Sequence, residues 1–405
     1  MGARGLITRT PWLARMPRTA IVLALGLLAV SAVWWALGWG LGLDSAIYRA
    51  GALTALHGDS LYSPLSTEPS WVPPLPFAYP PVAAIVFAPL AVLPPQLGWG
   101  VLAALSVLSL GGVLRVSMST DVTARWKAAV PVTLLAMFLL EPVWRTLALG
   151  QLNVVLMGMV VADLLVLKGS RASGVLTGLA AALKLTPLIF VLHLLVTGRR
   201  ADACRALGTF VALNAVAGLV LPSDTVRFWS VALIDGNDAT TNSWIGNQSL
   251  NGIVQRWAGG GPATLVIVGV LCLACLAISG VLVRRLHARG EGLGAMLVTA
   301  FCGLLVCPVS WTHHWVWVVP LVAFLVPRAL RGAPWARISL AAIAVVGTGW
   351  EFFVVPSGAH VELQWSVVEA VPGNAYVIAA LMLAAFVLVR MFRRRPSAVL
   401  DAPRA

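Results

Sequence analysis

Charged residues are scarce in this chain of 405 residues: they make up 11% of it, whereas 59% of the residues are hydrophobic. The mean hydropathy is +0.90. These values exclude a water-soluble domain of this size, because about a quarter of the residues of an ordinary globular domain are charged. The sequence also lacks an internal repeat, a low-complexity tract and a separate soluble domain. We therefore predict a single domain embedded in lipid.

Cysteine is also rare: the five cysteines lie in or beside apolar runs. Their odd number and placement argue against a disulfide framework. Cys272 and Cys275 form a C-x-x-C spacing, but inside a hydrophobic, helix-length stretch we interpret them as packing residues. No glycine-rich phosphate-binding motif precedes a predicted helix, and basic residues are not interleaved with aromatic ones. We therefore expect no cofactor, no metal and no nucleic-acid partner.

Apolar runs about long enough to cross a hydrocarbon core of ~30 Å recur from Ala20 to Val389. The first run follows four arginines, as a signal peptide would, but it lacks a small-residue cleavage site and we interpret it as a retained anchor. The sequence predicts an all-α polytopic membrane protein with about 12 spanning or half-spanning helices. We expect them near residues 20–41, 96–115, 128–142, 151–167, 172–183, 186–198, 204–221, 263–284, 293–307, 313–327, 338–355 and 374–391.

The distribution of basic residues predicts the orientation. Arginine-rich turns alternate with loops that are nearly free of arginine, and arginine-rich turns are typical of the cytoplasmic side. We predict a cytoplasmic N-terminal segment (1–19), one membrane domain (20–392) with outer loops at about 43–95 and 222–262, and a cytoplasmic tail (393–405). The net charge of +13 is then mainly a topology signal and an attraction to anionic membrane lipids. The preference for arginine over lysine is typical of GC-rich bacterial genomes, which suggests a bacterial plasma membrane.

Two of the predicted segments are too short to span. Residues 172–183 and 186–198 are both flanked by basic residues, so we predict a re-entrant helical hairpin with Lys184 and Pro187 near its tip. Such a break survives at membrane depth where it lines a polar cavity or is buried in protein. The short apolar stretch Val82–Leu93 is predicted to be an interfacial helix.

Asp44 directly follows the first predicted span, with Tyr48 one helical turn later and Arg49 beside it. A carboxylate on a short helix at the outer surface suits a general base. The alternative is an N-cap, since aspartate before Ser45 would cap a helix well.

Cations and histidines form the second group of candidates. His313 and His314 occupy an outer turn, where one of them could bind an anion or a hydroxyl group, or both could belong to an aromatic belt. Lys184 and Arg145 lie at or near membrane depth without an obvious carboxylate partner in the sequence. Each could neutralise a lipid phosphate, although Lys184 could also snorkel to an interface and Arg145 could be solvated.

The segment 247–252 offers the amides of Asn247, Gln248 and Asn251, which could hold sugar hydroxyls or belong to a helix-capping turn. The rare polar residues thus collect on one membrane face. One carboxylate with several cations and histidines fits a substrate linked to a lipid phosphate. A lipid or solute transporter is the alternative, because an intramembrane lysine and a broken hairpin would serve it equally well.

Seven motifs in this order resemble glycosyltransferase family 87, and the resemblance extends from about Asp44 to Pro320. They are Asp44-x3-Tyr48-Arg49-Ala50-Gly51, His57-Gly58-Asp59-x-Leu61-Tyr62, Phe77-Ala78-Tyr79-Pro80-Pro81, Gly150-Gln151-Leu152-Asn153, Leu183-Lys184-Leu185-Thr186-Pro187, Asn247-Gln248-Ser249-Leu250-Asn251-Gly252 and Pro308-Val309-Ser310-Trp311-Thr312-His313-His314.

The resemblance implies a GT-C-type bundle with periplasmic loops and short interfacial helices. It also implies an inverting transfer of mannose, at the periplasmic face, from polyprenyl-phosphate-mannose to a glycolipid acceptor such as a phosphatidylinositol mannoside or lipomannan, through an α-1,2 linkage. An arabinofuranosyl transfer from a decaprenyl-phosphate donor is the family alternative.

The resemblance makes Asp44 the catalytic base by its place in the first outer loop. Chemistry adds Arg145, Lys184, His313, His314 and Arg256 as candidates that stabilise the phosphate leaving group. The motifs add the substrate-binding candidates Tyr48, Arg49, Tyr79, Gln151, Asn153, Asn247, Gln248 and Asn251. The sequence predicts no oligomeric state.

Overall fold

A computed structural model describes residues 16–65, 69–119, 124–233 and 242–393. Within these ranges every regular element is a helix, and the only extended pairing is an isolated antiparallel bridge between Asn247 and Trp311. The predicted all-α class is therefore confirmed. The predicted cytoplasmic segments 1–19 and 393–405 lie almost wholly outside the described residues.

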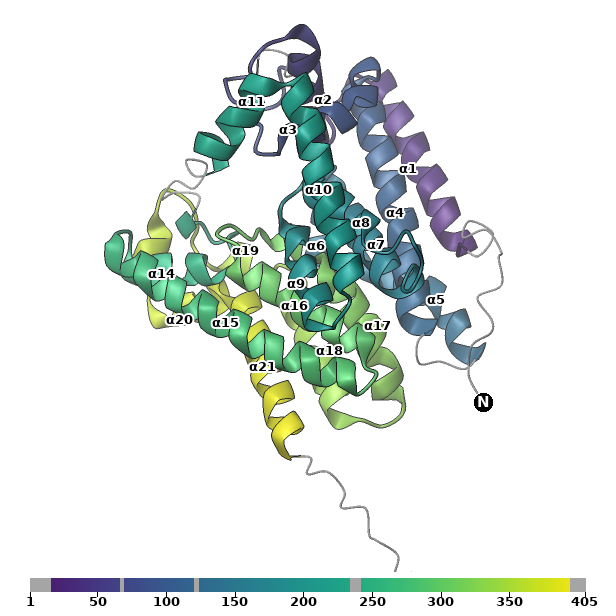
Figure 1. Ribbon diagram of the computed structural model, residues 1–405, viewed down its shortest axis with the longest axis vertical. Helices are drawn as coiled ribbons and strands as arrows, with labels where there is room; N and C mark the ends of the chain where they lie inside the picture. Colours follow the sequence, from purple (N-terminus) through teal and green to yellow (C-terminus); the bar gives the residue numbers. More distant parts are fainter. Residues whose placement is uncertain (1–15, 66–68, 120–123, 234–241, 394–405) are drawn as a thin grey trace, which may run out of the picture.

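The helices share one main buried core, to which α2, α4, α7, α16 and α17 each contribute several residues, and Figure 1 shows how they are arranged. In chain order they are α1 (Arg18–Ala36), α2 (Leu43–His57), α3 (Pro81–Val86), η2 (Ala88–Val92), α4 (Pro95–Ser119), α5 (Ala124–Met137), α6 (Glu141–Leu149), α7 (Asn153–Val161), η3 (Ala162–Val166), α8 (Val175–Leu183), η4 (Thr186–Leu188), α9 (Ile189–Val196), α10 (Arg200–Val220), α11 (Pro222–Arg227), η5 (Phe228–Ala232), α14 (Leu250–Ala258), α15 (Pro262–Ala288), α16 (Gly292–Val306), η6 (Thr312–Trp317), α17 (Val318–Leu330), α18 (Pro334–Val346), α19 (Glu351–Val354), η7 (Val361–Gln364), α20 (Val367–Gly373) and α21 (Ala375–Arg393).

The predicted number of about 12 membrane helices is not confirmed. Length and composition identify five candidate spans in the described residues, or up to seven if two sharply bent helix pairs each count as one. Other predicted segments are apolar helices of 10–17 residues, such as Gly292–Val306. At 1.5 Å per residue, such a helix is at most about 26 Å long and falls short of a ~30 Å hydrocarbon core. Hydropathy alone does not separate these cases, because a helix buried among other helices is as apolar as one that faces lipid.

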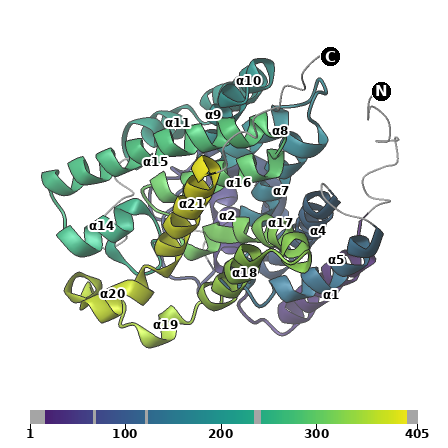
Figure 2. The same ribbon diagram turned by 90° about the horizontal axis from the view of Figure 1, so that it is seen from below.

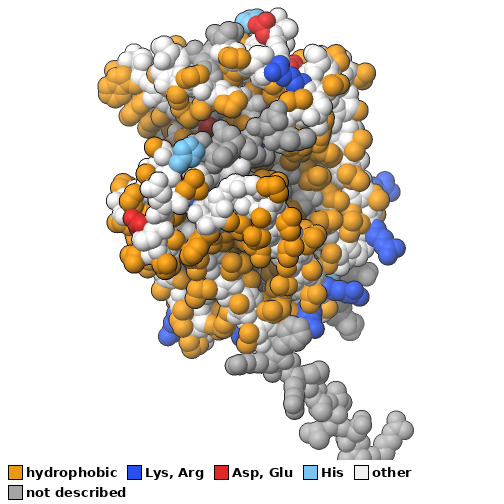
Figure 3. All heavy atoms as spheres, turned by 90° about the vertical axis from the view of Figure 1, so that its left-hand side faces the viewer, with side chains coloured by type: hydrophobic (Ala, Val, Ile, Leu, Met, Phe, Trp, Pro, Cys, Tyr) orange, Lys and Arg blue, Asp and Glu red, His pale blue; other side chains and the backbone are white. Residues whose placement is uncertain are grey.

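The candidate spans differ in what covers them. In α4, 72% of the spanning window is buried, whereas in α1 and α15 the values are 17% and 11%. Helix α1 lies against α4, where Gly100 permits close approach: a β-carbon there would stand 2.2 Å from the Ser31 hydroxyl oxygen. The apolar surface of α15 contributes to a broad hydrophobic face bordered along its lower margin by lysine and arginine side chains (Figure 3). A lipid-facing exterior around a packed core follows from these values.

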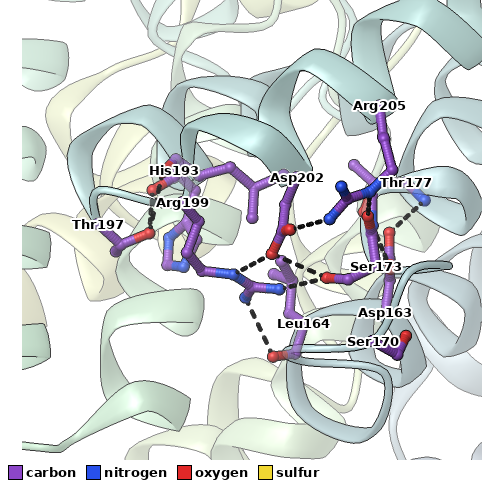
Figure 4. A network of polar contacts seen from close by, with 12 residues as sticks. Asp163, Leu164, Ser170, Ser173, Thr177, His193, Thr197, Arg199, Asp202 and Arg205 are labelled. Atoms are coloured by element: carbon purple, nitrogen blue, oxygen red, sulfur yellow. Dashed lines mark hydrogen bonds and ion pairs between the residues drawn. The ribbon is translucent and has the colours of Figure 1, made fainter.

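The chain from 172 to 198 turns back on itself as predicted for a helical hairpin, and its re-entrance into the membrane stays a prediction. Helix α8 ends at Leu183, Lys184 is extended (φ −152°, ψ 127°), and η4 and α9 return the chain. The two ends of the hairpin lie together, because the Arg199 guanidinium donates to the Ser173 hydroxyl at 2.7 Å (Figure 4).

Charged groups hold this base of the hairpin. The Arg199 Nε donates to Asp202 at 2.7 Å, and Arg205 donates both to Asp202 and to the Ser173 carbonyl (Figure 4). The buried Asp163 carboxylate accepts the backbone N–H groups of Gly174 and Thr177 at 2.7 and 2.8 Å, at the start of α8. These contacts fix the base of the hairpin and thereby help to position Lys184 at its tip.

The two predicted outer loops contact one another. One oxygen of the buried Asp224, in α11, accepts the Leu61 backbone N–H at 3.0 Å and the Ser60 hydroxyl at 3.2 Å. Val82–Leu93 forms α3 and η2, as two short helices against α2. In Figure 1 the first residues of α1 and the last residues of α21 form the lower ends of these two helices. The placement of both termini in the cytoplasm stays a prediction.

Candidate active site

Asp44 lies in the first turn of α2, with its side chain partly exposed. Gly42, with φ +74°, occupies the N-cap position, so the N-cap alternative for Asp44 is wrong. Its carboxylate instead accepts the side-chain amide of Gln151 at 2.8 Å, and among the described residues this bond reaches only Oδ2. The other carboxylate oxygen can therefore accept a substrate hydroxyl.

Gln151 is brought to Asp44 by the turn between α6 and α7. Gly150 ends α6 in the left-handed region (φ +71°), and a β-carbon there would stand 2.6 Å from the Ser45 hydroxyl oxygen. Only glycine suits both the backbone conformation and the close approach to α2. This explains physically why the motif Gly150-Gln151-Leu152-Asn153 begins with glycine.

Two tyrosines orient the Gln151 amide. The buried Tyr48 hydroxyl, one turn after Asp44, donates to Gln151 Oε1 at 2.7 Å, and the Tyr79 hydroxyl lies 3.0 Å from that of Tyr48. Because Oε1 accepts from Tyr48, the amide nitrogen faces Asp44 and can only donate. The network holds the carboxylate in one orientation.

A cationic cluster lies beside this network. Lys184 Nζ is 2.9 Å from Asn153 Oδ1 and 3.1 Å from His314 Nε2, and it stands 5.6 Å from the centre of the Tyr79 ring. An ammonium group only donates, so His314 Nε2 accepts and the imidazole carries its proton on Nδ1. Lys184 and His314 are both partly exposed. Lys184 therefore presents positive charge next to Asp44, and the neutral His314 ring presents an N–H donor.

His313 is placed differently. Its side chain is buried, and its carbonyl accepts the Asn153 amide at 2.9 Å and the Thr146 hydroxyl at 3.0 Å. It thereby attaches the 312–317 turn to α6 and α7. A direct substrate contact of the His313 ring stays a prediction.

Arg145 has a carboxylate partner, contrary to the expectation from the sequence. Its guanidinium lies 3.3 Å from the buried Glu141 carboxylate and 4.8 Å from the centre of the Phe352 ring. Glu141 also accepts the Thr312 hydroxyl at 2.7 Å and the Tyr376 hydroxyl at 3.1 Å. The spacing of four residues within a helix was the available signal for the ion pair.

Glu351 is a second buried acid that sequence reasoning missed. Its side chain is fully buried, and neither carboxylate oxygen has a hydrogen-bond partner among the described residues. Burial, with the nearby Glu141, raises the pKa of Glu351 to about 7. No motif or spacing in the sequence marks it, because it is a single glutamate near the end of the predicted helix 338–355.

The other predicted substrate-binding residues donate hydrogen bonds to backbone carbonyls of the protein. Arg49 Nε donates to the Leu93 carbonyl at 2.7 Å. Asn247 and Asn251 both donate to the Pro308 carbonyl, and Gln248 donates to Ile245 and Gly373 carbonyls.

Arg256 is buried and donates to Asn374 and to the backbone carbonyls of Ser243, Trp244 and Asn247. Ser249 caps α14 by accepting the Gly252 N–H at 3.0 Å, which confirms the helix-capping alternative for this segment. The amides and Arg256 bond to residues outside the Asp44 cluster. Sugar binding by these amides and phosphate binding by Arg256 stay predictions.

The electrostatic environment of Asp44 suits a base. Burial raises the pKa of its carboxyl above the ordinary value, while the hydrogen bond from Gln151 and the positive charges of Lys184 and Arg145 lower it. Among the described residues no group of three or more His, Cys, Asp or Glu side chains could hold a metal ion. The expected absence of a metal and a cofactor stays a prediction.

A comparison with protein-family models decides the class. The model of glycosyltransferase family 87 matches residues 77–310. This chain belongs to glycosyltransferase family 87. It is therefore a membrane glycosyltransferase with several apolar spans, and the Gln151, Lys184 and Asn153 cluster falls inside the matched segment.

Three mannosyltransferases are similar to this chain over most of its length. A polyprenol-phosphate-mannose-dependent alpha-(1-2)-phosphatidylinositol pentamannoside mannosyltransferase of Mycobacterium tuberculosis is 33% identical over 87% of this chain and 83% of its own length. The Mycolicibacterium smegmatis protein of the same description is 34% identical over 84% of this chain and 83% of its own length. A second M. smegmatis protein, described as a phosphatidylinositol mannoside mannosyltransferase with the same donor dependence and linkage, is 30% identical over 87% and 86%. No solved structure matches the chain.

Proposed function

We propose that this family 87 protein is an inverting α-1,2-mannosyltransferase that moves mannose from polyprenyl-phosphate-mannose to a mannosylated phosphatidylinositol glycolipid. The similarity to the three mannosyltransferases supports the donor, the linkage and the acceptor class. Asp44 belongs to a predicted outer loop, on the side opposite the arginine-rich turns that are typical of the cytoplasm. This charge pattern supports a reaction at the outer, periplasmic face of the plasma membrane.

Asp44 is the catalytic base in this proposal. It takes the proton of the acceptor hydroxyl while the hydroxyl oxygen attacks the anomeric carbon, the bond from that carbon to the phosphate oxygen breaks, and the electron pair leaves with the polyprenyl phosphate. The attack from the opposite side turns a β-linked donor into an α-linked product. Gln151 holds the carboxylate at 2.8 Å with one oxygen toward the acceptor.

Lys184, His314 and Arg145 stabilise the leaving phosphate. The group departs as a stable anion, so it needs positive charge and not a proton from an acid. Lys184 fits best, since it is partly exposed, adjoins His314 at 3.1 Å and is close enough to Asp44 for their charges to interact.

The observation that carries the proposal is the meeting of one base and one ammonium group from distant parts of the chain, joined through Tyr79 and Gln151. Its test is mannose transfer by detergent-purified protein from polyprenyl-phosphate-mannose to a phosphatidylinositol mannoside, with the linkage determined by mannosidase digestion and mass spectrometry. Asp44→Asn keeps the size and the acceptor oxygen but removes the basicity. We expect kcat to fall about 10²–10⁴-fold.

The matched control is Asp59→Asn, an exposed aspartate in the same outer loop. We expect it to retain activity. Near-normal transfer by folded Asp44→Asn would contradict the assignment of Asp44 as the catalytic base. An active arabinosyl donor in place of the mannosyl donor would favour the arabinofuranosyltransferase alternative, and the absence of any transfer by folded wild type would favour a lipid or solute transporter.

A further inference from the structure

A large cavity lies away from the Asp44 site. It has a volume of about 980 Å³ and lies between α14, α15, α16, α17 and α21. That volume is at the upper end of the range for small-molecule sites. Its walls are mainly apolar, with Leu271, Phe301 and Leu383 among them, and none of the residues of the Asp44 cluster lines it. Helices α15 and α21 lie near each other when the molecule is viewed from below (Figure 2).

Three arginines at the C-terminal ends of three helices line this cavity. Arg289 follows α15, Arg328 lies in the last turn of α17, and Arg390 lies in the last turn of α21. Glu291 is the one acidic residue among the lining groups, so the lining carries a net positive charge. The three arginines belong to the arginine-rich turns that the charge pattern assigns to the cytoplasm.

Aromatic rings hold two of these guanidinium groups. Arg390 lies over the Trp335 ring at 4.7 Å from its centre, and Trp335 stacks on Phe386 with ring centres 5.9 Å apart. Arg328 lies 3.6 Å from the centre of the Phe324 ring. A guanidinium that stacks by its face presents its N–H edge, which matches phosphate geometry. Trp335 has the amphipathic ring that is typical of a membrane interface.

We propose that this cavity binds an anionic two-chain phospholipid, with the acyl chains between α15 and α21 and the headgroup phosphate at Arg289, Arg328 and Arg390. Basic pockets between membrane helices on the cytoplasmic side are suited to anionic headgroups. A zwitterionic lipid would fill the apolar part but would leave the positive charge uncompensated. The phosphate of the polyprenyl donor belongs at Lys184, in a cluster that does not line this cavity.

The test measures binding without any sugar substrate, so its outcome is independent of mannose transfer. The full chain is purified in detergent and depleted of lipid. Its Tm is then measured with dioleoylphosphatidylglycerol, with dioleoylphosphatidylcholine, which has the same acyl chains, and with undecaprenol. We expect phosphatidylglycerol to raise the Tm more than the other two, because a ligand that binds only the folded state stabilises it.

The variant Arg328→Gln/Arg390→Gln should lose at least half of the extra shift that phosphatidylglycerol produces. Arg284→Gln, an exposed arginine of α15 that does not line the cavity, should retain it. If the double variant does not fold, Arg390→Gln alone and the phosphorus content of protein purified from mixed vesicles give the same comparison.

Equal shifts with the two phospholipids would overturn the proposal, as would an equal loss in Arg284→Gln. Undecaprenol as effective as phosphatidylglycerol would overturn it too, and would indicate a polyprenyl chain as the occupant.

Discussion

Single hydrogen bonds set the proposed chemistry at Asp44. The amide of Gln151 could point either way, but the Tyr48 hydroxyl at 2.7 Å from Oε1 selects the orientation that donates to the carboxylate. A donated hydrogen bond stabilises the charged form of a carboxylate, whereas burial favours the neutral form. The two effects oppose each other at this group, so small changes nearby should alter its ionisation.

The pH dependence of transfer should report this balance. Burial raises the pKa of Asp44, and a base acts only when ionised, so kcat/KM should fall on the acidic side at a pH above the ordinary aspartate value of about 3.9. Replacing Gln151 by Leu removes a bond that lowers this pKa. The acidic limb should therefore move to higher pH, and Asp59→Asn should leave it in place. A limb that moves downward in Gln151→Leu would contradict the assignment.

Lys184→Gln should weaken the use of the donor more than that of the acceptor. A hydrogen bond to a charged group contributes about 1.5–3 kcal/mol, so we expect kcat/KM for the polyprenyl donor to fall about ten- to hundredfold. Lys168→Gln makes the same change at an exposed lysine outside the Asp44 cluster and should have no effect. Equal losses for donor and acceptor would point to a structural role for Lys184.

At the scale of elements, the hairpin 172–198 could be predicted from the sequence, but the hydrogen bonds that hold its base could not. Its short apolar halves and flanking basic residues indicate a broken re-entrant segment. The bonds that hold its base join Arg199 to Ser173 and Asp163 to the start of α8, and these partners come from separate turns. Hydropathy contains no information about such pairings.

Asp163→Asn should loosen the hairpin. The change places an amide N–H₂ opposite backbone donors that the carboxylate now accepts at 2.7 and 2.8 Å, and an unsatisfied buried donor costs about 1–3 kcal/mol. We expect a lower Tm in detergent together with slower transfer, because Lys184 lies at the tip. Ser170→Ala, at an exposed position of the same turn, is the control. An unchanged Tm would mean that the hydrogen bonds of Asp163 do not stabilise the hairpin.

At the scale of the whole molecule, a broad apolar face and a margin of basic side chains determine how the protein lies in the membrane (Figure 3). The weakly buried α15 belongs to this face, whereas the weakly buried α1 lies on the other side of the molecule (Figure 1). In the orientation that we propose, the reaction and the phospholipid belong to opposite leaflets.

The orientation is testable with a membrane-impermeant maleimide on intact cells, in a variant whose five cysteines are replaced by serine. Asp59→Cys, in the outer loop, should react, whereas Ala288→Cys, at the end of α15, should react only after the cells are opened; both positions are exposed. The reverse pattern would place the Asp44 site in the cytoplasm.

Composition and pattern alone determined that this chain is helical, lies in a membrane and has one arginine-rich side, because these properties depend on residue type and local period. The ordered motifs also indicated the family and Asp44. Only the tertiary structure decided which polar residues share the site: Gln151 reaches Asp44 across 107 positions, whereas Arg256 and Asn247 bond within another part of the fold. It also decided how many helices are long enough to span. A lipid-facing and a protein-facing apolar side chain are identical in sequence, and only packing distinguishes them.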